Sequence, residues 1–108
     1  MNLHIKDRIY IPQMLPQQNN FMGFNLKREI IKKVGLTEAD KETYNIEEDT
    51  KNSRITWDVQ KDREMPLVVE FSKDELNYLK TACETLAEAN YPDDFWMTVE
   101  KIYNEAQG

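Results

Sequence analysis

The sequence has very few of the residues that metal, redox and nucleophilic sites most often use. Among its 108 residues there is one cysteine, Cys83, and one histidine, His4. A single cysteine cannot form an internal disulfide or a paired-cysteine zinc site, which fits a reducing compartment. His4 lies close to the N-terminus, and no HExxH motif is present. We therefore predict no metal site and no histidine-based catalysis.

Glycine is also scarce, and its spacing excludes the common nucleotide-binding loops. The three glycines match neither GxGxxG nor GxxxxGK[ST]. No run in the sequence approaches the roughly 18–20 apolar residues that span a bilayer. The N-terminal stretch lacks the long apolar core of a signal peptide. The sequence thus predicts a cytoplasmic protein with no cofactor, no membrane association and no enzymatic activity.

The composition that is present is typical of one small globular domain. A hydrophobic share of 40% beside 31% charged residues is ordinary for a folded chain. A length of 108 residues supports one core and is too short for two. We therefore predict a single domain over residues 1–108.

The net charge of −6 is unevenly distributed along the chain. Residues 1–35 carry six basic and two acidic residues, residues 36–65 five and nine, and residues 66–108 three and nine. A chain this acidic is not attracted to phosphate backbones as a whole, although a local basic face can be. The acidic remainder of the surface aids solubility.

The most specific local signal lies where a strand at 67–71 meets a helix. Ser72 is followed three residues later by Glu75, which is a capping box directly after that strand. The helix is predicted to continue to about Ala89, with an apolar face formed by Leu76, Leu79, Cys83 and Leu86. Pro92 is typical of the start of a second helix, whose apolar face is formed by Phe95, Val99, Ile102 and Ala106.

The first half of the chain predicts three helices. Residues 3–15 fit a strand or a helix, and their spacing favours a short helix that Pro12 ends or kinks, followed by a loop. Asn25 is a suitable N-cap for the next helix, whose inner face is formed by Leu26, Ile30, Ile31 and Val34. Thr37 is a suitable N-cap for a further short helix, with Asp40 completing a weaker capping box.

Two alternating stretches, at 54–59 and 67–71, predict a β-hairpin. Ile55, Trp57 and Val59 share one face of the first stretch, and the loop at 60–65 is of hairpin length. Because a lone hairpin is marginal, we expect its apolar face to rest on helices. The chain is therefore predicted to be α+β, with about five helices packed on one two-stranded antiparallel hairpin. The order of elements in its first two thirds is also that of a winged helix.

Two groups of residues are candidates for binding. The first is apolar and would mark a protein interface if exposed together; the alternative is that it folds back over the core. Its members are Met14, Leu15, Phe21, Met22 and Phe24. The second is a basic helix face, a candidate for nucleic acid or simply a solvated surface, formed by Lys27, Arg28, Lys32 and Lys33.

Nucleic acid is the weaker of the two predicted ligands. In a winged helix, the helix that begins at Thr37 would enter the major groove. Its acidic residues Glu38, Asp40 and Glu42 outnumber Lys41 and would repel phosphates.

Short motifs distributed over most of the chain carry a family resemblance. They are Ile5-Lys6-Asp7-Arg8 with Leu15-Pro16, Leu36-Thr37-Glu38, Ile55-Thr56-Trp57, Val69-Glu70-Phe71, a helix with Leu79 and Leu86, and Ile102-Tyr103-Asn104-Glu105. In these motifs the chain resembles small uncharacterised proteins encoded by bacteriophages, prophages and related mobile elements. That group typically has a glycine soon after the Leu-Pro pair, where this chain has Gln17-Gln18-Asn19-Asn20. The resemblance implies a phage or prophage origin and action in the cytoplasm of a bacterial host, and it implies no functional residue.

We therefore expect a non-enzymatic accessory protein of a phage or mobile element that binds a host or phage protein. A homodimer is a further expected partner arrangement. An inhibitor that imitates nucleic acid through its acidic C-terminal half is a special case of this hypothesis. A winged-helix-like nucleic-acid binder and a minor virion component are the alternatives.

Overall fold

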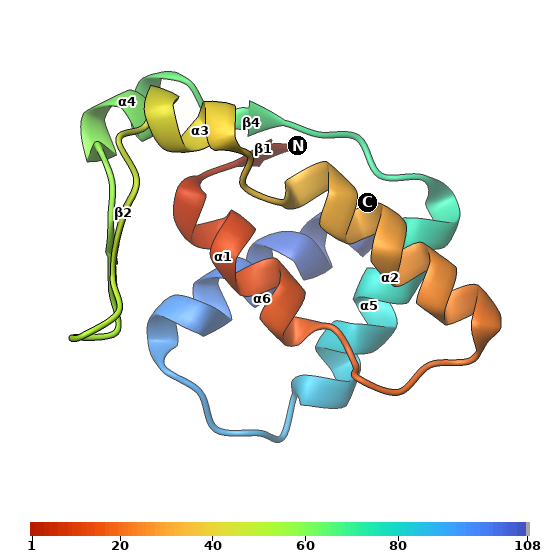
Figure 1. The fold of residues 1–108 in the computed structure, drawn as a ribbon. Coiled ribbons are helices and arrows are strands. Elements are labelled where there is room, and N and C mark those ends of the chain that lie inside the picture. Colours follow the sequence, from red (N-terminus) through yellow and green to blue (C-terminus); the bar gives the residue numbers. More distant parts are fainter. Residues whose placement is uncertain (108) are drawn as a thin grey trace.

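Four helices form the body of the protein, and a smaller unit extends from them. The computed structural model describes residues 1–107, and the body contains α1 (Ile5–Met14), α2 (Phe21–Val34), α5 (Lys73–Leu86) and α6 (Asp93–Gln107). Helix α5 packs against α6 and α2, and α1 packs against α6 and α2 (Figure 1). The predicted α+β class, with helices and one two-stranded antiparallel hairpin, is confirmed.

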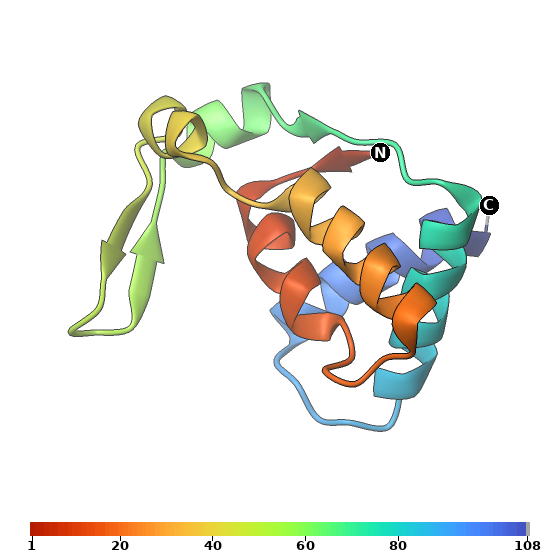
Figure 2. The same cartoon turned by 45° about the vertical axis from the view of Figure 1, so that its right-hand side comes forward.

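The remaining elements form an arm and a short sheet. The arm, residues 38–64, contains α3 (Glu38–Thr43), β2 (Glu47–Asp49), β3 (Arg54–Thr56) and α4 (Val59–Glu64). Strands β2 and β3 form an antiparallel hairpin that projects away from the helices (Figure 2). Strand β1 (Asn2–Leu3) pairs antiparallel with β4 (Leu67–Val68). Within residues 1–107, no helix is both long enough and apolar enough to cross a membrane.

The hairpin is not the predicted one. Strand β3 pairs with β2, whose three residues are all acidic and lie outside both stretches that were predicted to be strands. Residues 59–64 form α4 where a loop was predicted, because Asp58 accepts a hydrogen bond from the Lys61 N–H at 3.1 Å and caps that helix. Of the second strand predicted at 67–71, only Leu67–Val68 is a strand, and it pairs with β1 instead.

The apolar face of the predicted hairpin is also placed differently. Ile55 is 38% exposed and Val59 is 51% exposed, so the expectation that they rest on helices is wrong. Both belong to the arm, which contributes no residue to the hydrophobic cluster of the body.

Helices α1 and α2 are both longer than predicted. Helix α1 continues past Pro12 and ends at Met14, because the residue before Pro16 favours an extended backbone. Helix α2 begins at Phe21 rather than after Asn25, since Asn20 is its N-cap. Phe21, Met22 and Phe24 therefore lie in the first turn of α2, ahead of the predicted start of the helix.

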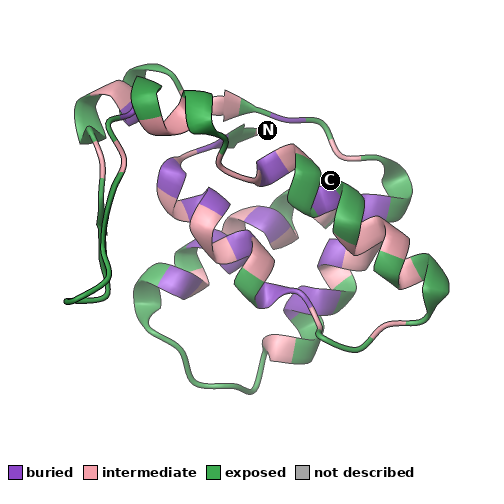
Figure 3. Cartoon of the chain, in the orientation of Figure 1, coloured by how far each residue is buried: buried purple, intermediate pink, exposed green. Residues whose placement is uncertain are grey.

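The core lies between the four body helices, where buried residues line their facing sides (Figure 3). Its most enclosed apolar side chains come from β1 and from every body helix: Leu3, Ile5, Ile11, Met14, Ile30, Val34, Leu79 and Ile102. The ring of Phe95 joins them and contacts the rings of Tyr91 and Tyr10, at centroid distances of 4.4 and 5.4 Å. Most of the predicted inner faces of α5 and α6 belong to this core, whereas Leu76 and Ala106 are only half-buried and lie outside the cluster.

The capping box before α5 is present as predicted. Ser72 Oγ accepts a hydrogen bond from the Glu75 N–H at 3.2 Å, and Glu75 Oε1 accepts one from the Ser72 N–H at 2.7 Å. The same carboxylate pairs with Lys33 of α2 at 2.5 Å. Burial alone would raise the pKa of Glu75, but the hydrogen bonds from Lys33 and Ser72 hold it below its usual value. One carboxylate therefore caps α5 and joins it to α2.

Replacing Ser72 by alanine is expected to lower the free energy of unfolding by about 1 kcal/mol, because the Glu75 N–H loses its acceptor. Urea denaturation at neutral pH measures this loss. Thr81→Ala in the same helix is the matched control, since Thr81 Oγ1 bonds only within the helix, to Asn77 O. Alanine favours the helix, so no loss is expected there. Equal losses in the two variants would show that the cap does not stabilise α5.

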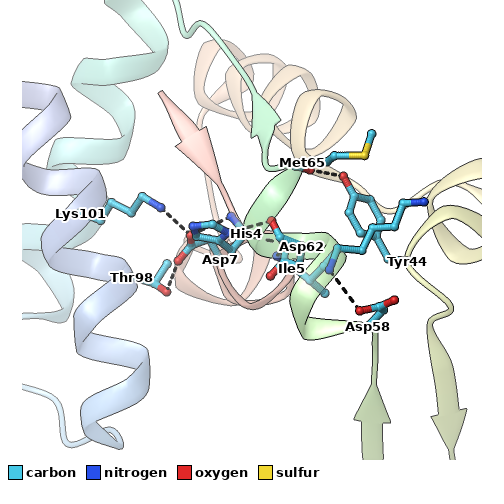
Figure 4. A network of polar contacts seen from close by, with 10 residues as sticks. His4, Ile5, Asp7, Tyr44, Asp58, Asp62, Met65, Thr98 and Lys101 are labelled. Atoms are coloured by element: carbon cyan, nitrogen blue, oxygen red, sulfur yellow. Dashed lines mark hydrogen bonds and ion pairs between the residues drawn. The ribbon is translucent and has the colours of Figure 1, made fainter.

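Asp7 joins α1 to α6 inside the protein (Figure 4). Its side chain is buried, and Thr98 Oγ1 and Lys101 Nζ donate to it at 2.7 and 2.8 Å. The His4 N–H donates a third hydrogen bond at 3.1 Å, so Asp7 also caps the start of α1. Several donors thus offset the cost of burying this charge.

A second set of contacts holds the base of the arm to the body. The buried carboxylate of Asp62 in α4 accepts a hydrogen bond from the Ile5 N–H at 3.0 Å (Figure 4). The Tyr44 hydroxyl, just after α3, donates to Met65 O beyond α4. The buried Arg8 side chain of α1 donates to Val34 O, Gly35 O and Asp40 of α3, at 2.9, 2.7 and 2.7 Å. The base of the arm is therefore fixed, while its hairpin extends into solvent.

Candidate protein-interaction surface

The candidate surface is built where the loop at 15–20 meets α2. The Tyr78 hydroxyl of α5 donates to Asn19 Oδ1 at 2.7 Å, and burial raises the pKa of that hydroxyl. Asn19 Nδ2 donates to Pro16 O at 3.1 Å, and Lys27 Nζ of α2 donates to the same oxygen at 2.9 Å. The loop is therefore held in one position against both helices.

The first turn of α2 packs closely on this loop. Asn20 Oδ1 accepts a hydrogen bond from the Gly23 N–H at 2.8 Å. A Cβ at Gly23 would lie only 3.2 Å from that oxygen and 3.3 Å from Asn19 Cβ, so glycine permits the close approach. Phe21, the first helical residue after this cap, is 80% exposed.

One side of α2 combines exposed apolar groups with cations. Phe24 is 50% exposed and lies about one turn after Phe21, and Ile31 is 37% exposed and lies about two turns after Phe24. The Arg28 guanidinium lies between them in sequence and stands 5.4 Å from the centroid of the Phe24 ring. We call this side, formed by Phe21, Phe24, Arg28, Ile31 and Lys32, the α2 face.

A groove of about 350 Å³ runs along the α2 face. Phe24 and Ile31 are its apolar lining, and three cations and two amides complete it: Lys27, Arg28, Lys32, Gln17 and Asn19. None of the residues that line this groove, within the described chain, is acidic. A groove with an apolar lining and positive charge suits an apolar segment that carries carboxylates.

The candidate apolar residues do not all reach this groove. Met22 is 71% exposed but lines a different hollow, of about 330 Å³, between α2 and α5. Met14 and Leu15 are 2% and 5% exposed and belong to the core, so the prediction that they contact a partner is wrong. They are buried because α1 extends to Met14 and turns its last apolar side chains towards the other helices.

The four basic residues that were candidates for nucleic-acid binding also differ in exposure and in their contacts. Lys33 forms an ion pair with Glu75 and donates a hydrogen bond to Glu70 O at 3.1 Å. Lys27 donates a hydrogen bond to Pro16 O in the loop. Arg28 and Lys32 remain on the α2 face, with Glu29 lying 3.6 Å from Lys32. The structure thus brings two of the four cations to the groove as exposed side chains and holds the other two in internal contacts.

A winged helix is not confirmed. Helix α3, which would be its recognition helix, has six residues, and none of them is buried. Its capping box is present as predicted, with Thr37 Oγ1 accepting from the Asp40 N–H at 3.1 Å. The Asp40 carboxylate pairs with Arg8, which ties α3 to α1.

Sequence reasoning missed Ile31 as a surface residue and did not single out Gln17 and Asn19. Ile31 was expected on the inner face, but Ile30 and Val34 hold that position and turn Ile31 outwards. The spacing of Phe24 and Ile31, seven residues apart, was a signal that both lie on one side. The two amides had no such signal, because their position depends on the fold of the loop.

The two residues considered for catalysis lie elsewhere. Cys83 is buried in the core as predicted, and burial raises the pKa of its thiol to about 11. His4 is the N-cap of α1, and its Nδ1 lies 3.3 Å from Asp62 O. Among residues 1–107, no three His, Cys, Asp or Glu side chains are grouped so that they could hold a metal ion.

Comparison with protein-family models, with curated proteins and with solved structures finds no match.

Proposed function

We propose that this protein is a non-enzymatic interaction protein that binds a partner protein through the α2 face. The observation that carries the proposal is the exposure of Phe21 and Phe24 in the first turn of α2, where Phe24 lines a groove with positive charge. Large apolar side chains grouped at the surface of a small domain are typical of an interface. The fixed loop supports this role, since a preformed surface loses little conformational freedom on binding.

The charge of the groove indicates the chemistry of the partner. Arg28 and Lys32 lie beside the apolar lining, in a protein whose net charge is −6. An apolar segment that carries Asp or Glu would be attracted to this face and repelled by most of the remaining surface. The motif resemblance to proteins of phages and mobile elements supports an accessory role for this contact in the cytoplasm of a bacterial host.

The double variant Phe21→Ser, Phe24→Ser is expected to stay folded and to lose its partner. Burial of two phenylalanine side chains contributes enough that affinity should fall by about 100-fold or more. The tagged protein is used to capture partners from host lysate, with and without nuclease, and the captured proteins are identified by mass spectrometry. A defined protein that survives nuclease and is absent with the double variant is the expected result.

The double variant Val68→Ser, Met97→Ser is the matched control, because both side chains are exposed apolar groups outside the α2 face. It is expected to capture the same partner as the wild-type chain. Equal capture by the Phe21, Phe24 variant would remove the α2 face as the interface.

Nucleic acid is the second candidate ligand, because Lys27, Arg28 and Lys32 line one groove without an acidic neighbour in its lining. The nuclease arm of the same experiment separates the two functions. Loss of every captured partner on nuclease treatment would favour nucleic acid over protein.

A further inference from the structure

The hairpin of the arm is a two-stranded sheet, and no other strand within residues 1–107 pairs with either of its outer edges. The residues of β2 and β3 are exposed at every position. Each strand has one neighbour, and the hairpin stands clear of the helical body in both views (Figures 1 and 2). Such a hairpin is marginal in water unless another strand or helix packs on it. Its outer edges are therefore available to a further strand.

Apolar side chains remain exposed beside β3. Ile55 is 38% exposed and Val59 is 51% exposed, and together with Trp57 they line a hollow of about 220 Å³. Ile55 lies within β3, Trp57 follows that strand, and Val59 begins α4, so these apolar side chains are grouped at the end of β3. A single chain leaves these side chains in contact with water, so an additional chain would gain by covering them.

Charge decides which edge can pair with a second copy of the chain. In antiparallel pairing about a two-fold axis at Glu48, that residue would face its own copy, and Glu47 would face Asp49. Carboxylates would then lie about 5 Å apart at Cβ and repel one another. The acidic β2 edge therefore opposes self-association.

Pairing at the β3 edge does not bring carboxylates together. About a two-fold axis at Ile55, that residue would face its own copy, and Arg54 would face Thr56. This arrangement sets no like charges directly opposite each other and brings two apolar β-branched side chains together.

We propose that two copies of this chain associate through their β3 edges into a four-stranded antiparallel sheet of order β2-β3-β3-β2. The contact is isologous, so it closes with two copies. It does not depend on the α2 face, and it leaves that face free for the partner protein.

Sedimentation velocity tests the proposal. The wild-type chain is expected to show a monomer–dimer equilibrium between about 10 µM and 1 mM, because short strands associate weakly. Ile55→Lys and Ile55→Glu, each alone, should weaken the dimer by at least about tenfold, because like charges then meet at the axis. An equimolar mixture of the two variants should recover association, since opposite charges then meet there.

Glu48→Gln is the matched control, because Glu48 pairs with Ile55 within the hairpin but lies on the other strand. It is expected to dimerise like the wild-type chain. A wild-type chain that stays monomeric overturns the proposal, and so does a dimer that neither Ile55 variant weakens or that the mixture does not recover. A dimer strengthened by Glu48→Gln would assign the contact to the β2 edge instead. Circular dichroism confirms that each variant keeps its helices, since the hairpin lies outside the core.

Discussion

Replacing Asp7 by alanine is expected to lower the free energy of unfolding by about 3 kcal/mol. The variant removes a buried acceptor and leaves three donors behind: Thr98 Oγ1, Lys101 Nζ and the His4 N–H. Thr98 is 1% exposed, so its hydroxyl cannot regain a hydrogen bond to water without local opening. Urea denaturation of the two proteins at neutral pH measures the difference.

Asp94→Ala is the matched control for this variant. Asp94 also pairs with a lysine, Lys6, but at 3.6 Å and with a side chain that is 66% exposed. An exposed pair of this kind contributes little, so the loss should stay below about 0.5 kcal/mol. If the two variants lose similar amounts of unfolding free energy, the buried contacts of Asp7 stabilise the protein no more than an exposed ion pair does.

The pKa of Asp7 adds a pH dependence to the same prediction. Burial alone would raise this pKa, but hydrogen bonds from Lys101, Thr98 and the His4 backbone hold it below its ordinary value. A lowered pKa in the folded state means that Asp7 contributes stability above its unfolded pKa of about 3.9 and loses it as the pH falls through the folded pKa. The stability difference between the wild-type chain and Asp7→Ala should therefore narrow in acid and stay constant near neutral pH. A difference that widens in acid would contradict this sign.

Replacing Arg8 by alanine is expected to cost about 2–4 kcal/mol and to loosen the arm. The buried guanidinium donates hydrogen bonds to Val34 O and Gly35 O at the end of α2 and to the Asp40 carboxylate of α3. Without it, these acceptors lose their donor at the point where α3 leaves the body. Amide hydrogen exchange should show protection falling in α3 by a larger factor than in α5.

Lys41→Ala is the control for the Arg8 variant. Lys41 belongs to α3 and pairs with Glu38 at 3.5 Å on the surface. Its loss should change protection in α3 very little, because exposed pairs three residues apart contribute only tenths of a kcal/mol. If α3 and α5 lose protection equally in Arg8→Ala, the residue stabilises the body as a whole and does not act as a tether of the arm.

The elements that the sequence predicted correctly are those with complete local signals. Ser72 and Glu75 form their capping box within four residues, and Thr37 and Asp40 do the same before α3. The apolar spacing of α5 and α6 also lies within single helices, so local reading was sufficient to place most of their inner faces, with Leu76 and Ala106 as the exceptions. The burial of Cys83 followed from the same spacing.

The hairpin shows where local reading failed. The alternation of Ile55, Trp57 and Val59 is a genuine strand pattern, but only Arg54–Thr56 forms a strand. The cap at Asp58 starts a helix that competes with strand continuation. Strand β4 finds its partner in β1, more than 60 residues away in the sequence, and no local pattern specifies such a pairing.

The apolar residues that were candidates for partner binding are separated into core and surface for the same reason. Met14 and Phe24 are equally apolar, and composition alone treats them alike. The packing of α1 against the other body helices buries Met14, whereas the Asn20 cap and the loop held by Tyr78 leave Phe24 in solvent beside Arg28. Which apolar residue is core and which is surface depends on contacts between helices.

The sequence by itself determined the α+β class, the capped starts of α3 and α5, and the inner faces of α5 and α6. Each of these depends on residues within a few turns of one another, where hydrogen bonds and side-chain spacing act locally. Only the tertiary structure decided the strand partners, the exposed arm, the buried contacts of Asp7 and Arg8, and the α2 face. Those features depend on residues far apart in the sequence, and their energies exist only when the helices pack together.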